Sequence, residues 1–190
     1  AEVMKSQGRY PPVEPGDFDI MSQKVDFLGI NYYMGFACTN ASTGDQPHNY
    51  QVNFVDSREK TDMGWDICPE GIYHLIKRLS VEYPDVPFYI TENGAAYDDP
   101  VQVEAGVRRV HDERRIRYLE GHLASAARLC QEGVPLKGYY LWSLLDNFEW
   151  AFGYGKRFGM IHVDFESQTR TLKDSALWYA EVIRRGGFSF

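Results

Sequence analysis

Val86-Pro87-Phe88-Tyr89-Ile90-Thr91-Glu92-Asn93-Gly94 is the stretch of sequence that decides the fold. Its β-branched and aromatic residues predict a strand over 86–92, and the Asn-Gly pair predicts the turn that ends it. In a parallel α/β barrel the carboxyl ends of the strands form the active-site face, so a carboxylate at this point is placed for chemistry. Taken alone, Glu92 would more often be a solvated turn residue than a catalytic one. The remaining segments of the chain favour the first interpretation.

Around this strand, apolar strands alternate with amphipathic helices. Ile72, Leu75, Ile76 and Leu79, for example, have the i, i+3, i+4, i+7 spacing of one helix face. The patterns predict strands at 26–33 and 138–144 and helices at 18–22, 69–82, 112–132 and 174–185. Strand 26–33 is nearly continuous in its apolar character, which is typical of a strand buried on both faces. The opening residues and the polar segment 40–62 are predicted to be loops, the second long enough to be a functional surface loop.

Strands joined by long helical crossovers form a parallel sheet. Three such strands cannot close a barrel, which needs eight strands and typically about 250 residues. An isolated sheet of this kind would leave its edges open to other chains. We therefore expect residues 1–190 to be a single α/β unit, the C-terminal portion (about strands 6–8) of a TIM (β/α)8 barrel whose N-terminal part is not in this chain.

Composition excludes several classes of protein. The net charge of −7 argues against a nucleic-acid partner, which needs a basic face. No apolar run approaches the length of a membrane span. The three cysteines form no Cys-x-x-Cys pair, no histidine cluster completes a metal site, and no cofactor motif is present. Three unpaired thiols are typical of a reducing cytoplasm, where we expect the protein to reside.

Two further segments accompany the Glu92 strand, in the same order and at comparable intervals as in one known family. They are Asp26-Phe27-Leu28-Gly29-Ile30-Asn31-Tyr32-Tyr33 and Leu141-Trp142-Ser143-Leu144-Leu145-Asp146-Asn147-Phe148-Glu149-Trp150. With the downstream stretch 156–165, they resemble the retaining β-glycosidases of glycoside hydrolase family 1. The resemblance covers nearly the whole chain, but only the C-terminal part of the family's catalytic domain.

The resemblance implies catalytic roles for two residues. Glu92 matches the nucleophile, and Tyr33 matches the tyrosine whose hydroxyl keeps that carboxylate ionised and oriented. Asn31, two residues before Tyr33, matches a position near the glycon and the nucleophile. Retaining enzymes also need an acid/base carboxyl group about 5–5.5 Å from the nucleophile. The family takes it from an Asn-Glu-Pro motif that this sequence lacks, so a complementary N-terminal segment would have to supply it.

A second cluster implies recognition of the sugar. Trp142 matches the aromatic platform beneath the glycon, Glu149 the carboxylate that bridges two hydroxyls, Trp150 an indole N–H donor and Phe158 the wall of the site. A carboxylate binds vicinal hydroxyls well, and an indole face covers the apolar face of a pyranose. Trp65 is a candidate aglycone contact, with loop packing as the alternative. The other aromatic residues could also serve in a core, whereas a carboxylate within an aromatic stretch needs a polar partner.

The implied activity is hydrolysis of terminal β-D-glucosyl residues by a double displacement without metal or cofactor, with β-galactosides and β-fucosides as side substrates. Glu149 would repel a sugar phosphate, which favours neutral β-glucosides. Two other interpretations remain open. The chain could be a non-catalytic carbohydrate-binding protein that lacks the acid/base, or a structural half-barrel that serves only assembly.

Overall fold

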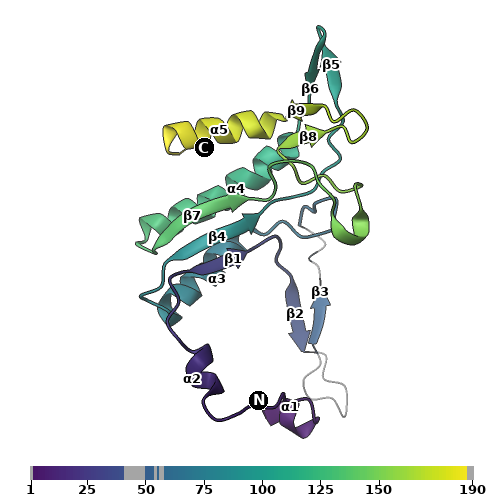
Figure 1. The fold of residues 1–190 in the computed structure, drawn as a ribbon. Coiled ribbons are helices and arrows are strands. Elements are labelled where there is room, and N and C mark those ends of the chain that lie inside the picture. The colour runs from purple at the N-terminus through teal and green to yellow at the C-terminus, as the bar shows by residue number, and fades with distance from the viewer. Residues whose placement is uncertain (1, 41–49, 54, 56–57, 188–190) are drawn as a thin grey trace.

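The computed structural model describes residues 2–40, 50–53, 55 and 58–187. Its centre is a three-stranded parallel sheet in the order β1–β4–β7, formed by Leu28–Asn31, Phe88–Asn93 and Leu136–Leu141 (Figure 1). The spatial order equals the chain order, as expected for consecutive βα units of a barrel. β4, the strand that carries Glu92, is therefore central, and β1 and β7 are the two edges.

Three long helices follow the three strands of the sheet. They are α3 (Pro69–Glu82), α4 (Glu113–Gln131) and α5 (Asp174–Arg185). The main core lies between the sheet and the first two of these helices, and its members include Ile72, Ile76, Phe88, Ile90 and Leu129, all with 0% exposure. Pro69 opens α3 at the first turn, where a missing N–H is harmless, and Gly186 ends α5 in the left-handed conformation.

Shorter elements complete the described part of the chain. They are α1 (Glu2–Ser6), α2 (Asp17–Met21), η1 (Trp150–Phe152) and three antiparallel hairpins, β2–β3 (Ala37–Asn40 with Tyr50–Asn53), β5–β6 (Gln102–Glu104 with Val107–Arg109) and β8–β9 (Ile161–Val163 with Arg170–Leu172). α1 and α2 lie apart from the sheet and its helices (Figure 1). None of the helices in the described ranges is both long and apolar enough to cross a membrane.

The structure corrects several expectations about these elements. The opening segment contains α1, and the predicted loop 40–62 contains β3, which pairs with β2, although residues 41–49 lie outside the described part. The strand expected at 26–33 is only Leu28–Asn31, and its burial on both faces was wrong. Gly29 and Asn31 are exposed because they alternate with buried Ile30 and so lie on the face of the sheet opposite the core formed with α3 and α4. The last strand of the sheet is displaced from 138–144 to Leu136–Leu141.

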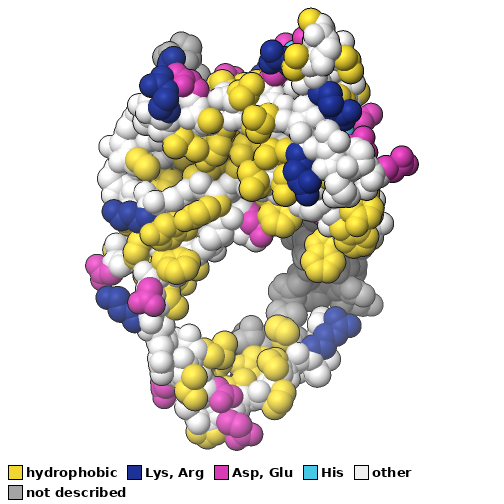
Figure 2. Space-filling view, turned by 45° about the horizontal axis from the view of Figure 1, so that its top comes forward, with side chains coloured by type: hydrophobic (Ala, Val, Ile, Leu, Met, Phe, Trp, Pro, Cys, Tyr) yellow, Lys and Arg dark blue, Asp and Glu magenta, His cyan; other side chains and the backbone are white. Residues whose placement is uncertain are grey.

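Apolar side chains are exposed on α2 and along the β7 edge of the sheet. Figure 2 shows them gathered over the middle of the molecule, with an opening between that body and the N-terminal segment. α2 has no buried residue, and its Ile20 and Met21 are 69% and 78% exposed. At the other edge an apolar groove runs between α4, β7 and α5, and Ile183 on its rim is 65% exposed. Both features agree with a partial barrel.

Candidate active site

The end of β4 carries an extra residue, and this explains how Glu92 leaves the core. Phe88 and Ile90 are buried on the helix side, and strict alternation would place Glu92 beside them. Between Ile90 and Asn93, however, β4 shifts register against both neighbouring strands. Such a bulge re-aims the side chains that follow it. Asn93 is consequently the fully buried residue, whereas Glu92 is only partly buried.

Glu92 has a well-defined partner in Tyr33, which follows β1. The Tyr33 hydroxyl donates a hydrogen bond of 2.6 Å to Glu92 Oε2. Burial raises the pKa of Tyr33 well above its usual value, and its hydrogen bond to Glu92 acts in the same direction. The tyrosine is thus a permanent donor to the carboxylate, because its own proton is held firmly.

Two further aromatic rings hold the Tyr33 ring. The centroid of Trp65 lies 5.6 Å from that of Tyr33, and the centroid of Phe158 lies 6.1 Å from it, both edge-on. Phe158 is 2% exposed and also packs against Trp65, at 6.1 Å. Edge-to-face pairs at these separations are favourable. Three segments far apart in the sequence therefore meet around the tyrosine that contacts Glu92.

Glu149 faces the same site from the segment after β7. Burial raises its pKa, the nearby negative charge of Glu92 raises it further, and a hydrogen bond with Trp142 works in the opposite direction. The two carboxylates are thus close enough to influence each other. Trp142 is tied to β4, since its backbone N–H donates to Asn93 O at 2.9 Å. A Cβ on Gly94 would meet Trp142 O at 1.8 Å, so only glycine allows this approach.

Two of the predicted site residues, Trp150 and Asn31, are exposed. Trp150 is 82% exposed and has φ of 42°, and the structure gives it no aromatic partner among the described residues. Asn31 is exposed at the end of β1, opposite Glu92 in the strand register, and its Oδ1 accepts a hydrogen bond of 2.7 Å from Thr91.

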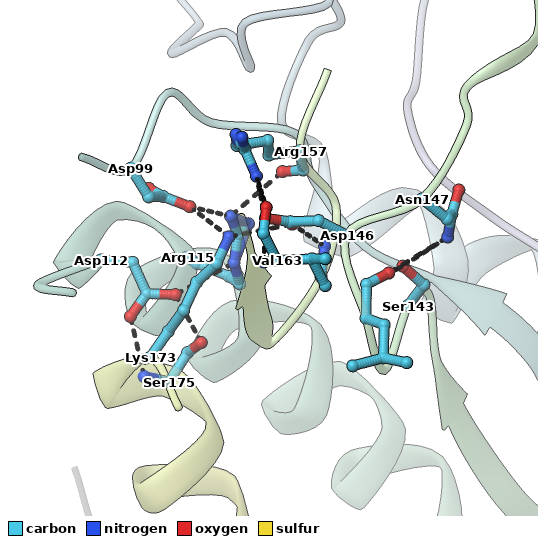
Figure 3. A network of polar contacts seen from close by, with 12 residues as sticks. Asp99, Asp112, Arg115, Ser143, Asp146, Asn147, Arg157, Val163, Lys173 and Ser175 are labelled. Atoms are coloured by element: carbon cyan, nitrogen blue, oxygen red, sulfur yellow. Dashed lines mark hydrogen bonds and ion pairs between the residues drawn. The ribbon is translucent and has the colours of Figure 1, made fainter. Parts of the chain in front are cut away.

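A buried network of charges supports the segment that carries Glu149 and Phe158 (Figure 3). Asp146 is its hub: it pairs with Arg157 at 2.6 Å and with Lys173 at 3.3 Å, and it accepts from the backbone N–H of Gly159 at 2.9 Å. Lys173, fully buried before α5, also pairs with Asp99 at 2.8 Å. Asp146 thereby joins both ends of the segment 143–160.

The network continues to α4, where Arg115 is 1% exposed. It pairs with Asp99 and, at 3.0 Å, with Asp112, and Asp112 in turn accepts from the backbone N–H of Ser175 at 2.8 Å. Burial lowers the pKa of Lys173 and raises that of Asp112, and partners of opposite charge or hydrogen-bond donors counter these effects. The segments after β7 and after β4 and the starts of α4 and α5 are thereby linked by charge-assisted hydrogen bonds.

Comparison with known proteins identifies the family. The sequence model of glycosyl hydrolase family 1 matches residues 1–188. The chain belongs to glycosyl hydrolase family 1. Among its curated family 1 relatives is Beta-glucosidase A of Thermotoga maritima, 49% identical over 172 residues, which make up 90% of this chain and 37% of that protein. A bifunctional beta-D-glucosidase/beta-D-fucosidase of Bifidobacterium breve is 44% identical over 181 residues, 88% of this chain and 39% of the relative.

The family also contains phospho-sugar enzymes. A 6-phospho-beta-galactosidase of Staphylococcus epidermidis is 40% identical over 200 residues, 95% of this chain and 42% of its own length. Among solved structures, the family 1 β-glucosidase from Thermotoga maritima superposes with a TM-score of 0.89 at 46% identity and covers 100% of this chain and 42% of that one. This chain therefore spans about two fifths of the relatives it matches, and it is the C-terminal part of a TIM barrel.

Several buried polar residues near the candidate site were not predicted from the sequence. Asn93 was assigned to a turn, yet it ends β4 and is completely buried. On α4, the buried stripe includes the polar residues Arg115 and His122. The i, i+3, i+4 spacing of that stripe could have been found if polar residues had been allowed on the face.

Proposed function

We propose that this chain supplies the nucleophile and the glycon-binding residues of a retaining β-glucosidase. The observation that carries the proposal is the 2.6 Å hydrogen bond between Tyr33 and Glu92, with Glu149 close enough for its pKa to respond to the charge of Glu92. A carboxylate held by a tyrosine donor beside a second carboxylate and aromatic faces is suited to attack on a sugar. Membership of family 1 and the β-glucosidases among the relatives support the same reaction.

The reaction would proceed in two displacements. In the first, a Glu92 oxygen forms a bond to the anomeric carbon while the bond to the leaving oxygen breaks, and an external acid protonates that oxygen. In the second, water replaces Glu92 at the anomeric carbon, and the same external group takes the water proton. That group would come from a complementary N-terminal barrel segment with an Asn-Glu-Pro motif, since this chain has none.

The sugar would be held by the cluster around Glu149. Its carboxylate would accept from two vicinal hydroxyls, Trp142 would lie beneath the ring and Phe158 would line the wall. Trp150 and Asn31, whose side chains are exposed, would close on the sugar from the open side, and Trp65 would lie toward the aglycone. A negative charge at Glu149 disfavours a sugar phosphate, so the substrates would be neutral β-glucosides, with β-galactosides and β-fucosides as side substrates.

The open edges of the sheet support the need for a partner segment. β1 and β7 each leave one edge of their backbone without a strand in this sheet, and the apolar groove along β7 and α5 lies beside the second edge. Strands one to five of a barrel would cover both edges. The three free thiols suit a reducing compartment, and we place the assembled enzyme in the cytoplasm.

Mechanism-based labelling tests this proposal. The chain would be combined with a segment that supplies the rest of the barrel, treated with a 2-deoxy-2-fluoro-β-glucoside that carries a good leaving group, and digested for peptide mapping. We expect one adduct, within residues 86–97, on Glu92. An adduct on another carboxylate would refute the assignment. Glucose binding without any adduct would instead favour the non-catalytic carbohydrate-binding protein.

A further inference from the structure

Asn93, the residue after the proposed nucleophile, is the centre of a hydrogen-bond cluster that joins β4, β7, α4 and the segment after β1. Its side chain has 0% exposure. Nδ2 donates to the Tyr32 carbonyl oxygen at 2.7 Å and to the Tyr118 hydroxyl at 3.0 Å. Oδ1 accepts a hydrogen bond from the Tyr139 hydroxyl. The orientation of the amide follows from these partners, because a carbonyl oxygen can only accept.

The direction of the Tyr118 hydrogen bond matters. Tyr118 accepts from Asn93 with its hydroxyl oxygen and donates its proton to the carbonyl oxygen of Tyr33 at 3.1 Å. Asn93 therefore holds two successive carbonyls of the segment after β1: that of Tyr32 directly, and that of Tyr33 through the Tyr118 hydroxyl. The Tyr33 side chain in turn donates to Glu92, the residue that precedes Asn93.

Tyr118 is itself fixed in place. It is 1% exposed on α4, and its ring stacks on His122 with centroids 4.0 Å apart. Burial lowers the pKa of His122 to about 4, so the ring is neutral near pH 7, and its Nδ1 lies 2.7 Å from the Tyr118 carbonyl oxygen. A neutral, packed imidazole thus supports Tyr118. We call the hydrogen-bond chain from Asn93 through the Tyr118 hydroxyl to the Tyr33 carbonyl oxygen the relay.

We propose that Asn93 is a positioning residue that aligns the Tyr33 hydroxyl with Glu92 through the Tyr118 hydroxyl. The inference rests on the proposed function, since it assigns Asn93 and Tyr118 a part in the same nucleophile site. Asn93 does not touch the substrate. It fixes the segment after β1 relative to the end of β4, so that the Tyr33 hydroxyl stays within hydrogen-bond distance of Glu92.

Tyr139 provides a matched control. Tyr118→Phe and Tyr139→Phe each remove one phenolic hydroxyl from the same buried amide and keep the ring. Only Tyr118→Phe breaks the relay to Tyr33. A purely structural role for the cluster would make the two substitutions equivalent in their effect on chemistry, whatever they do to thermal stability.

The experiment measures the rate of adduct formation at Glu92 and the dissociation constant of the same 2-fluoro-glucoside, in the chain combined with the rest of the barrel. We expect Tyr118→Phe to slow adduct formation about fivefold or more, the equivalent of one net hydrogen bond, without a matching change in the dissociation constant. Tyr139→Phe should change the rate by less than about threefold, because hydrogen-bond losses outside the relay act mainly on stability.

A double-mutant cycle completes the test. In a Tyr33→Phe background the relay has no hydroxyl to align, so Tyr118→Phe should have almost no further effect on the rate. Asn93→Leu, which removes both amide donors without adding a charge, should slow adduct formation at least as much as Tyr118→Phe, and it serves if that variant fails to fold. The inference is wrong if Tyr118→Phe and Tyr139→Phe slow adduct formation equally, or if the effects of Tyr118→Phe and Tyr33→Phe on the rate are additive. In either case, labelling of Glu92 in the wild type would still support the proposed function. If wild-type Glu92 is not labelled, the proposed function and the inference are both wrong.

Discussion

Tyr33 and Glu92, 59 residues apart in the chain, meet in a 2.6 Å hydrogen bond at the carboxyl end of the sheet. Two local features make this contact. The bulge at the end of β4 releases Glu92 from the core side of the strand, and the rings of Trp65 and Phe158 pack edge-on against Tyr33. The pairing thus depends on four segments of the chain, and its disruption should affect chemistry more than substrate binding.

Replacement of Tyr33 by Phe tests that pairing directly. The variant keeps the ring contacts and removes the donor to Glu92, and a hydrogen bond to a charged group contributes about 1.5–3 kcal/mol. We expect kcat/KM for an aryl β-glucoside to fall by about 10- to 150-fold, mostly in kcat. Tyr83→Phe, at a tyrosine that is 50% exposed after α3, is the control and should leave kcat/KM unchanged. A loss confined to KM would contradict the proposed role of Tyr33.

Glu149→Gln tests recognition of the neutral sugar. The amide keeps the shape, removes the charge and replaces one acceptor oxygen by a donor. With two charge-assisted hydrogen bonds weakened, transition-state stabilisation for a β-glucoside should fall by a few kcal/mol, at roughly 1.5–3 kcal/mol for each bond. Activity on a 6-phospho-β-glucoside should fall less, because a repulsive charge is removed. Steady-state kinetics on both substrates give the answer, and a wild-type preference for the phosphorylated substrate would show the glycon assignment to be wrong.

Asp146→Asn tests the buried network beneath the Glu149 segment. Loss of this charge leaves Lys173 and Arg157 with one fewer anionic partner, and removal of one member of a buried pair typically costs about 3–5 kcal/mol. We expect a lower urea midpoint of unfolding in the assembled enzyme, together with a higher KM. Glu166→Gln, an exposed acid in the β8–β9 turn, should change neither. If both variants unfold at the same urea concentration, the network contributes little to stability.

His111 predicts a pH dependence of stability. Its ring lies between Glu104 at 2.9 Å and Asp174 at 2.5 Å, and these hydrogen bonds, that of Glu104 foremost, raise its pKa. Because its pKa is higher in the folded than in the unfolded state, protonated His111 stabilises the fold. This contribution to the free energy of unfolding is complete below the unfolded-state pKa of about 6.5 and is lost as the pH rises through the folded-state pKa. The midpoint of thermal unfolding of wild type should therefore decline over this interval relative to His111→Gln. His74→Gln, at an exposed position on α3, is the control, and parallel profiles of wild type and His111→Gln would refute the prediction.

The isolated chain should be inactive. Residues 1–190 expose both sheet edges and contain no Asn-Glu-Pro motif, so the chain alone should self-associate and show no turnover of an aryl β-glucoside. Co-expressed with a segment that supplies strands one to five, it should form a soluble one-to-one complex with a bell-shaped pH profile of activity. Full activity of a monomeric chain would overturn this prediction.

The sequence predicted the elements well and the side-chain network poorly. Helix 69–82 and the position of Glu92 at a strand end were predicted because hydrophobic spacing and strand punctuation are local signals. The bulge that re-aims Glu92 has no such signal, since it is defined by pairing with both β1 and β7. The burial of Arg115 and Lys173 was missed for a related reason. Their partners Asp99 and Asp146 come from other segments of the chain, and a charged residue is predicted to be exposed unless its ion-pair partners are known.

The central place of β4 in the sheet bears on how such a barrel can be divided. Both neighbours of the strand that carries Glu92 belong to the same polypeptide, so the strand keeps its pairing when the barrel is cut outside β1 and β7. The docking of a second fragment then has to restore only the outer edges and bring in the missing acid. This chain and the segment that supplies strands one to five could each be fused to one of two test proteins. Association of the test proteins would then bring the fragments together, and release of a coloured phenol from an aryl glucoside would report that association.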